Sequence, residues 1–353
     1  MTTVDPAAAT CPVPHAETEK ILLGHGSGGQ LSAELLRDVL LPALGTAASA
    51  GVLEDAALVD VDGVGLVVST DSFVVSPLFF PGGDIGSLAV HGTINDLAMR
   101  GAMPVALTVA YIIEEGFGVT ELRRVTESIG AAARAAGVPV VTGDTKVVGR
   151  GAADGLFVTT TGIGRRPPEA WVSASFARPD DVVLLSGPIG AHGATILSTR
   201  EALGFESEIE SDTRALHRLV AAMIGVAGGA IHALRDPTRG GVASVLNEIA
   251  AASGVGIQID EQAVPVPPAV AAACELLGLD PLHVANEGCL IAIVAPAHAD
   301  SVLATMRSRP EGRDAVRLGR VRGDRAGRVV MNTLVGGERM VDMLVGEQLP
   351  RIC

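Results

Sequence analysis

The strongest constraint on the fold of this sequence is an alternation of apolar, β-prone runs with helical patterns that occurs twice along the chain. A short apolar run predicts a strand, whereas apolar residues that recur at helical spacing predict a helix. In the first half, the runs 57–61 and 65–70 flank Asp62-Gly63, a dipeptide suited to a tight hairpin turn. The other elements predicted in this half are helices at 30–41, about 85–100 and 121–136, and strands at 105–113 and near Val138 and Leu156.

The second half repeats this alternation after a Pro-rich, charged stretch, 165–181, whose composition suits a connection. Its predicted elements are strands at 182–185, 255–259, 290–294 and 316–321, helices near 194–203, 213–234, 241–253, 269–277 and 298–306, and a hairpin about Gly336-Gly337. The predicted fold class is therefore α/β with mixed α+β character, in two domains. The predicted segments are a disordered leader at 1–20, an N-terminal domain at 21–165, a C-terminal domain at 166–335, and a hairpin strand with a mobile tail at 336–353.

Composition and charge exclude several classes of protein. Of the 353 residues, 48% are hydrophobic and 19% charged, which is enough apolar material for a large core. The net charge of −14 argues against a duplex nucleic acid or an anionic membrane as partner, because nothing neutralises phosphates in bulk. No apolar run is long enough to span a bilayer, and the N-terminus lacks the pattern of a secretory signal. The four cysteines show no zinc-site spacing, so we expect a reducing, cytoplasmic location.

A glycine-rich stretch, Gly24-His25-Gly26-Ser27-Gly28-Gly29, runs directly into the predicted helix 30–41. It formally satisfies G-x-G-x-x-G, a pattern whose backbone N–H groups can hold a phosphate at a helix N-terminus. A dinucleotide site also needs an acidic strand end further along, and 46–51 is a small-residue loop instead. There is no Walker loop either. Two interpretations stay open, a hinge without a ligand and a lid over the phosphates of ATP.

Carboxylates recur at the predicted ends of elements, at Glu54-Asp55, Asp71, Asn95-Asp96, Asp144 and Asp236. Hard oxygen ligands of this kind suit Mg²⁺ that bridges nucleotide phosphates. Each one taken alone could equally be a helix cap or a turn residue. Their recurrence at strand ends favours a ligand site, because α/β sheets place ligands there.

Two short polar loops, Gly143-Asp144-Thr145-Lys146 and Asp236-Pro237-Thr238-Arg239-Gly240-Gly241, each pair an anion with a cation. The cations could counter phosphate charge during phosphoryl transfer. The alternative is a pair of surface loops with local ion pairs. Lys146 is one of only two lysines in the chain, so a solvated lysine face does not explain it.

The chain ends in Leu349-Pro350-Arg351-Ile352-Cys353, a segment too short for a regular element. We expect an extended, mobile tail beyond Leu344, able to carry a group bound to the terminal thiol. The nearby terminal carboxylate disfavours the thiolate of Cys353, so its modification requires a base or an activated donor.

Taken together, these stretches closely resemble the HypE family, part of the AIR synthase-related (PurM-like) superfamily that includes selenophosphate synthetase and thiamine-phosphate kinase. The resemblance covers residues 21–353. The stretches that carry it are 24–29, 69–73 (STDSF), 77–86 (PLFFPGGDIG), 143–148 (GDTKVV), 236–241 (DPTRGG), 284–288 (VANEG) and 346–353 (GEQLPRIC).

The resemblance implies a homodimer whose N-terminal domain binds ATP and whose C-terminal domain closes over the nucleotide. It implies that Cys353 accepts a carbamoyl group from the HypF carbamoyltransferase and that an ATP-dependent carbamoyl dehydratase reaction converts the group to a thiocyanate. The cyanide would then pass to iron held by a HypC–HypD complex during maturation of NiFe hydrogenase.

Roles for individual residues follow from the same resemblance and from the chemistry of dehydration. Phosphorylation turns the carbamoyl oxygen into a leaving group, and two N–H protons must be removed. Glu287 is the candidate base, and Lys146 would orient the carbamoyl or neutralise the phosphoryl group. Predicted Mg²⁺ ligands are Asp55, Asp71, Asp96 and Asp144. Predicted ATP contacts are Gly26, Ser27, Gly28, Asp71, Asn95, Asp144, Thr145, Asp236 and Arg239.

Two other functions stay open at this point. One is a superfamily kinase with a diffusible substrate, which would not need the terminal cysteine. The other is a non-catalytic scaffold that uses the nucleotide as a conformational signal.

Overall fold

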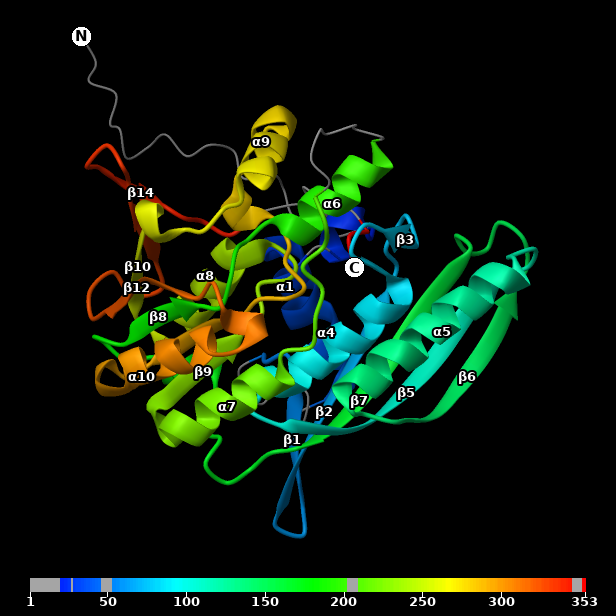
Figure 1. Ribbon diagram of the computed structural model, residues 1–353, viewed down its shortest axis with the longest axis horizontal. Helices are drawn as coiled ribbons and strands as arrows, with labels where there is room; N and C mark the ends of the chain where they lie inside the picture. Colours follow the sequence, from blue (N-terminus) through cyan, green and yellow to red (C-terminus); the bar gives the residue numbers. More distant parts are fainter. Residues whose placement is uncertain (1–19, 27, 46–52, 202–208, 345–350) are drawn as a thin grey trace.

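Two β-sheets, one from each half of the chain, organise the structure and lie on opposite sides of the molecule (Figure 1). The computed structural model describes residues 20–26, 28–45, 53–201, 209–344 and 351–353. The predicted leader up to residue 19, Ser27 and the tail segment 345–350 lie outside the described residues.

The first sheet has five strands, in the order β1-β2-β7-β5-β6. Its strands are β1 (Ala57–Val61), β2 (Val64–Phe73), β5 (Met103–Glu114), β6 (Val140–Val148) and β7 (Leu156–Arg165). All neighbours run antiparallel except β5 and β6. The hairpin predicted at Asp62-Gly63 is confirmed, with Val61 opposite Val64 and positive φ angles of 53° and 81° at the two turn residues.

Helices cover only one face of this sheet. Helix α4 (Ile85–Met99) packs on β2 and β7, and α5 (Val119–Ala136) packs on α4. Helix α4 begins at Asp84, whose side chain accepts from the backbone N–H groups of Gly86 and Ser87 in a capping box. The opposite face has no helix on it among the described residues. The register places exposed apolar side chains there: Val59, Val61, Val64, Met103, Ile112 and Ile163.

The second sheet has seven strands, in the order β14-β13-β10-β12-β8-β11-β9. They are β8 (Val182–Leu185), β9 (Ile231–Arg235), β10 (Gly256–Asp260), β11 (Ile291–Val294), β12 (Val316–Arg322), β13 (Val329–Asn332) and β14 (Glu338–Met340). Only β10 and β13 pair in parallel.

Both faces of this second sheet are buried at β8, β9 and β11. In β8, Val183 and Leu185 pack with α8 (Gly241–Ser253), whereas Val182 and Leu184 pack with α7 (His217–Ala227) and α10 (Pro296–Arg307). A strand covered on both faces needs apolar residues at every position, which explains the continuous apolar runs in the sequence.

The helix predicted at 213–234 is wrong in its second part. Helix α7 ends at Ala227, and Ile231–Arg235 is instead the edge strand β9. Gly228 has a φ of 49° and a ψ of −127°, a conformation that ends the helix, but the apolar pattern continues past it. The correction matters because Asp236 follows β9 directly.

The remaining elements are short. They are α1 (Gln30–Leu35), a π-helical turn (Leu36–Leu40), α2 (Leu41–Leu44), β3 (Phe79–Phe80), β4 (Gly83–Asp84), α6 (Ala191–Arg200), α9 (Pro268–Leu277), and 3₁₀ turns at Leu23–Gly26, Ala174–Phe176, Gly228–Ala230, Glu261–Ala263, Pro281–His283 and Pro310–Gly312. None of the helices in the described ranges is long and apolar enough to cross a membrane.

Candidate active site

Three carboxylates from distant parts of the chain meet between the two sheets. Asp55 precedes β1, Asp96 lies on α4, and Asp236 follows β9. One oxygen atom from each lies within 4.8 Å of the others. The structure thus brings together two of the predicted metal ligands, Asp55 and Asp96, with a residue predicted to contact ATP, Asp236.

The electrostatics of this cluster fit a divalent cation. The pKa of Asp55 is raised to about 6 and that of Asp236 to about 8. Burial is the largest cause of both shifts, and neighbouring carboxylates contribute to them. Burial and the same neighbours raise the pKa of Asp96 well above its usual range. The Oδ2 atom of Asp55 is buried and has no hydrogen-bond partner. A cation among these oxygens would both satisfy that atom and offset the repulsion.

Two residues that the sequence did not single out hold the cluster in place. The Nη1 atom of Arg235 lies 2.9 Å from Oδ1 of Asp55, and the same guanidinium pairs with Glu248. Ser69 donates to Oδ2 of Asp96 at 2.5 Å. Ser69 stands two positions before Asp71 on the same face of β2, a period-2 signal that could have identified it. Arg235 directly follows the helix predicted at 213–234, so the sequence did not identify it as the end of a strand.

Glu287 lies fully inside the protein, in the loop before β11. Its backbone N–H donates to Oδ1 of Asp212 at 3.1 Å, and the N–H of Gly288 donates to Oδ2 of the same carboxylate at 2.9 Å. Burial first, and then the charges of Asp236 and Asp212, raise the pKa of Glu287 well above its usual range. The raised pKa makes the ionised Glu287 carboxylate a stronger base than an exposed one, and it can accept a proton only while it is ionised.

Two asparagines fix the position of this loop. Asn286 accepts from the N–H of Gly190 at 2.6 Å and donates to the carbonyl of Pro237 at 2.9 Å, so it joins the VANEG loop to the DPTRGG loop. Asn95 donates to the carbonyl of Glu287 at 3.4 Å and accepts from the N–H of Leu216 at 2.8 Å. Asn95 therefore lies behind Glu287, and its side chain bonds to backbone groups of Arg214, Glu287 and Leu216. The role of Asn95 as an ATP contact stays a prediction.

The end of the chain docks beside Glu287. The backbone N–H of Val74 donates to the terminal carboxylate of Cys353 at 2.9 Å, and the N–H of Ser76 donates to the carbonyl of Arg351 at 3.2 Å. The side chain of Ile352 is only 5% exposed and belongs to an apolar core formed by residues of both halves of the chain. Burial raises the pKa of the Cys353 thiol to about 12, Arg239 opposes this rise, and the nearby Glu287 reinforces it.

The glycine-rich loop lies against Arg239. A Cβ atom at Gly28, whose φ is +78°, would come within 2.5 Å of the Cβ of Arg239. The guanidinium of Arg239 donates to the carbonyl of Gly26 at 3.2 Å, and its charge lowers the otherwise raised pKa of Asp71. Four of the predicted ATP contacts, Gly26, Gly28, Asp71 and Arg239, are therefore neighbours, whereas Ser27 lies outside the described residues.

The structure does not bring Asp144, Thr145 and Lys146 into this group. Lys146 pairs with Asp144 at 2.6 Å, and both side chains are more than half exposed on the edge strand β6. The register pairs Asp144 with Ala110 and Lys146 with Ile112, which places both on the bare face of the first sheet, opposite the face that carries Asp71. Within one chain these residues cannot reach the acidic cluster.

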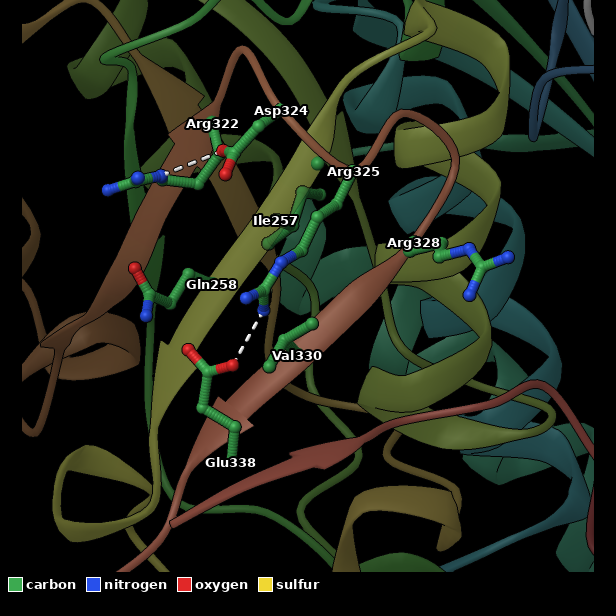
Figure 2. A pocket seen from close by; sticks show the side chains of 9 residues that line it. Ile257, Gln258, Arg322, Asp324, Arg325, Arg328, Val330 and Glu338 are labelled. Carbon is green, nitrogen blue, oxygen red and sulfur yellow. Dashed lines mark hydrogen bonds and ion pairs between the residues drawn. The ribbon is translucent and has the colours of Figure 1, made fainter. Parts of the chain in front are cut away.

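A separate pocket lies on the second sheet, between β10, β12 and β13 (Figure 2). Its charged lining is largely paired, since Arg322 lies 3.2 Å from Asp324 and Arg325 lies 2.8 Å from Glu338. None of its lining residues belongs to the acidic cluster or contacts the docked tail. We therefore assign the chemistry to the region around Asp236, Glu287 and Cys353.

Comparisons with known proteins match both halves of the chain to described domain families. Residues 53–166 match the family described as AIR synthase related protein, N-terminal domain, and residues 178–332 match the corresponding C-terminal domain family. The chain is 55% identical over 334 residues to the carbamoyl dehydratase HypE of Cupriavidus necator, an alignment that covers 95% of each protein.

Two solved structures are similar over nearly the whole chain. The structure of a HypE–HypF complex has a TM-score of 0.83 at 46% identity and covers 90% of this chain and 100% of the solved chain. The structure of the hydrogenase maturation protein HypE in complex with ATP has a TM-score of 0.79 at 49% identity and covers 95% and 100%.

Proposed function

The chain belongs to the HypE family of carbamoyl dehydratases, and from this premise we propose that it uses ATP to dehydrate a carbamoyl group on its own Cys353 to a thiocyanate. The product would supply cyanide ligands for the iron of NiFe hydrogenase. The observation that carries the proposal is the docked tail, which brings the Cys353 thiol among Arg239, Glu287, Asp71 and Asp96. A diffusible-substrate kinase has no need to seat its own C-terminus in this position.

ATP is the phosphoryl donor in this proposal, with its phosphates beside the glycine-rich loop and Arg239. The acidic cluster would hold Mg²⁺ through Asp55, Asp96 and Asp236, and the unpaired Oδ2 of Asp55 supports this assignment. Asp71 lies close enough to act on the pKa values of both Asp96 and Asp236. When bound, the ion would offset the negative charge that develops on the phosphoryl group during transfer.

The proposed reaction has two steps. The carbamoyl oxygen attacks the γ-phosphorus of ATP, ADP leaves, and one N–H proton is lost as the carbon–nitrogen double bond forms. Loss of the second N–H proton and of inorganic phosphate completes the carbon–nitrogen triple bond. Glu287 accepts a proton from the carbamoyl nitrogen, and Arg239 faces the phosphoryl group. The Asp212 contacts to the Glu287 loop keep that base in position.

A homodimer would complete the site. The first sheet leaves one face bare and apolar, and Asp144 and Lys146 lie on that same face. Packing of two such faces against each other would bury this surface and could direct Lys146 of one subunit toward the acidic cluster of the other.

Mixing two inactive variants tests this arrangement. Lys146→Ala and Glu287→Gln chains, denatured and refolded together, should recover about a quarter of wild-type activity, because half of the dimers are mixed and each contains one intact site. No recovery in a mixture shown to contain mixed dimers would refute the shared site.

HypF is the proposed carbamoyl donor, and a HypC–HypD complex is the proposed acceptor of the cyanide. The relative solved with HypF supports the first of these partners. A reducing compartment such as the cytoplasm would keep the Cys353 thiol available.

The deciding experiment follows the mass of the tail. The protein is incubated with HypF and its substrates, repurified, and divided into samples with and without MgATP. The Glu-C peptide Gln348–Cys353 should gain a carbamoyl group and then, only with ATP, lose one water. An unmodified tail in a protein that still binds or consumes ATP would favour the superfamily-kinase or scaffold hypothesis instead.

A further inference from the structure

One buried titratable residue near the tail has no place in the chemistry above. His192 lies in the first turn of α6 with no exposed surface, and the sequence motifs did not include it. Its Nε2 atom lies 2.6 Å from the carbonyl oxygen of Ile352, and its Nδ1 atom lies 2.8 Å from Oγ of Ser211. The ring therefore links the C-terminal domain to the docked tail.

The two contacts fix the protonation of the ring. A carbonyl oxygen can only accept, so Nε2 carries the proton and donates to Ile352. Nδ1 then accepts from the Ser211 hydroxyl, as a neutral imidazole does. Burial lowers the pKa of His192, which favours this neutral form. The ring also packs edge-on against Phe80, with centroids 5.6 Å apart, so its plane is held as well.

His192 and the first domain hold the tail from two different sides. The carbonyl of Arg351 accepts from the backbone N–H of Ser76 and from the guanidinium of Arg200 on α6, and the terminal carboxylate of Cys353 accepts from the N–H of Val74. Among the described residues, the carbonyl of Ile352 between them accepts from His192. Arg351 has a φ of +52°, an unfavourable conformation for a residue with a Cβ, so the bend before Ile352 needs such support.

The tail position sets where the reacting sulfur lies. The Ile352 carbonyl is the last backbone acceptor before Cys353, and the thiol next to it lies among Glu287 and Arg239. Displacement by one residue along an extended chain moves a group by about 3.3 Å, more than the reach of a hydrogen bond. A fixed bond at Ile352 therefore sets the depth at which the thiol enters the site.

We propose that His192 is a positioning residue, which holds the Ile352 carbonyl so that the group carried on Cys353 meets Glu287 and the phosphoryl donor. The catalytic consequence of this inference rests on the proposed function. The claim that His192 holds the tail in place is independent of that function.

Alkylation of the tail tests the structural content directly, without ATP or a carbamoyl group. The full-length protein is treated with iodoacetamide, and modification of Cys353 is followed in the Glu-C peptide against the buried Cys289 as internal reference. His192→Phe keeps an aromatic ring beside Phe80 but removes the donor, and should increase the rate at Cys353 about tenfold, the factor expected for one lost hydrogen bond. His192→Gln places an amide N–H at a similar reach and should stay within about twofold of wild type.

Ser198→Ala is the matched control, because Ser198 lies on the same helix and bonds only to the carbonyl of Ala194. Its alkylation rate should equal that of wild type. If His192→Phe fails to fold, Ser211→Ala removes the hydroxyl that orients Nδ1 and that also accepts from the N–H of Thr213, and should increase the rate about threefold. An unchanged rate in the folded Phe variant, or in Ser211→Ala where that variant is used, would overturn the proposal.

A second measurement separates positioning from a general structural effect. In the water-loss assay, His192→Phe should lower the first-order rate of dehydration while the Kd for ATP stays unchanged, and His192→Gln should restore the rate. Parallel losses of ATP binding and thermal stability would show a structural role instead. If the carbamoyl group on wild-type Cys353 never loses water, the proposed function is refuted. The alkylation result still decides whether His192 holds the tail.

Discussion

The acidic cluster should make the protein without bound cation less stable as the pH rises from 6 to 8, and Asp236 should account for much of the loss. The pKa of Asp236 is about 8 in the folded protein, mainly because of burial, against about 3.9 for an unfolded aspartate. The folded state therefore retains a proton that the unfolded state has already lost. The resulting stability is fully present below pH 4 and is lost as the pH rises through 8.

The magnitude follows from proton linkage. Each bound-proton difference changes the free energy of unfolding by about 1.4 kcal/mol per pH unit. The proton on Asp236 is nearly fully bound at pH 6 and half bound at pH 8, so the loss over this range is about 2 kcal/mol. With an unfolding entropy of about 2.1 cal/mol/K per residue, this corresponds to a fall in Tm of about 3 °C.

Asp236→Asn keeps the shape of the side chain and removes its titration. The Tm of the metal-free variant should therefore exceed that of wild type by about 3 °C more at pH 8 than at pH 6, as measured by differential scanning fluorimetry with EDTA. Asp314→Asn, a change to an exposed carboxylate, should show no such difference. Addition of MgATP at pH 8 should raise the Tm of wild type and have little effect on Asp236→Asn. Equal pH slopes for wild type and Asp236→Asn would refute the assignment of the raised pKa to this residue.

Other changes give further tests. Arg235→Met should lower the free energy of unfolding, measured in urea, by about 3 kcal/mol, because Asp55 and Glu248 lose their buried cation. A loss below about 1 kcal/mol would mean that the ion pairs of Arg235 contribute little. Gly28→Ala should destabilise the protein by at least about 1 kcal/mol, because Gly28 has a positive φ and an added Cβ would contact Arg239. Gly26→Ala should have a much smaller effect, because nothing lies within 4 Å of the added Cβ. Equal effects of the two substitutions would contradict the close packing at Gly28. Asn286→Ala should lower the free energy of unfolding by about 3 kcal/mol and slow dehydration, because Gly190 and Pro237 lose their hydrogen-bond partner. An unchanged rate of dehydration would show that the two loops hold their positions without Asn286.

Much of the fold could be predicted from local patterns. Strand β8 appears in the sequence as an unbroken apolar run because both of its faces are buried, and the hairpin at Asp62-Gly63 is specified by its turn residues. Strand β9 was missed for the opposite reason. Its residues Ile231 to Leu234 continue the apolar pattern of α7, and only the glycines between them mark the change.

Proximity between distant segments was harder to predict. Asp55 and Asp236 flank strands and Asp96 lies within α4, and only the packing of the two halves brings their oxygens together. Asp144 and Lys146 match the family pattern just as well, yet the β6 register places them on the opposite face of the sheet. A histidine that bonds to the backbone of the tail has no side-chain pattern to identify it, because any residue at position 352 supplies the same carbonyl.

The buried position of the tail also constrains the order of events. With its pKa raised to about 12 by burial, the docked Cys353 thiol is protonated at neutral pH and is a poor nucleophile. We therefore expect Cys353 to accept its carbamoyl group while undocked, where the thiol is exposed to water and to the donor enzyme. Once carbamoylated, the sulfur has no proton to lose and carries no charge, so its burial next to Glu287 incurs no penalty from desolvated charge. Docking of the partly buried Cys353 side chain therefore favours the loaded tail over the free thiolate.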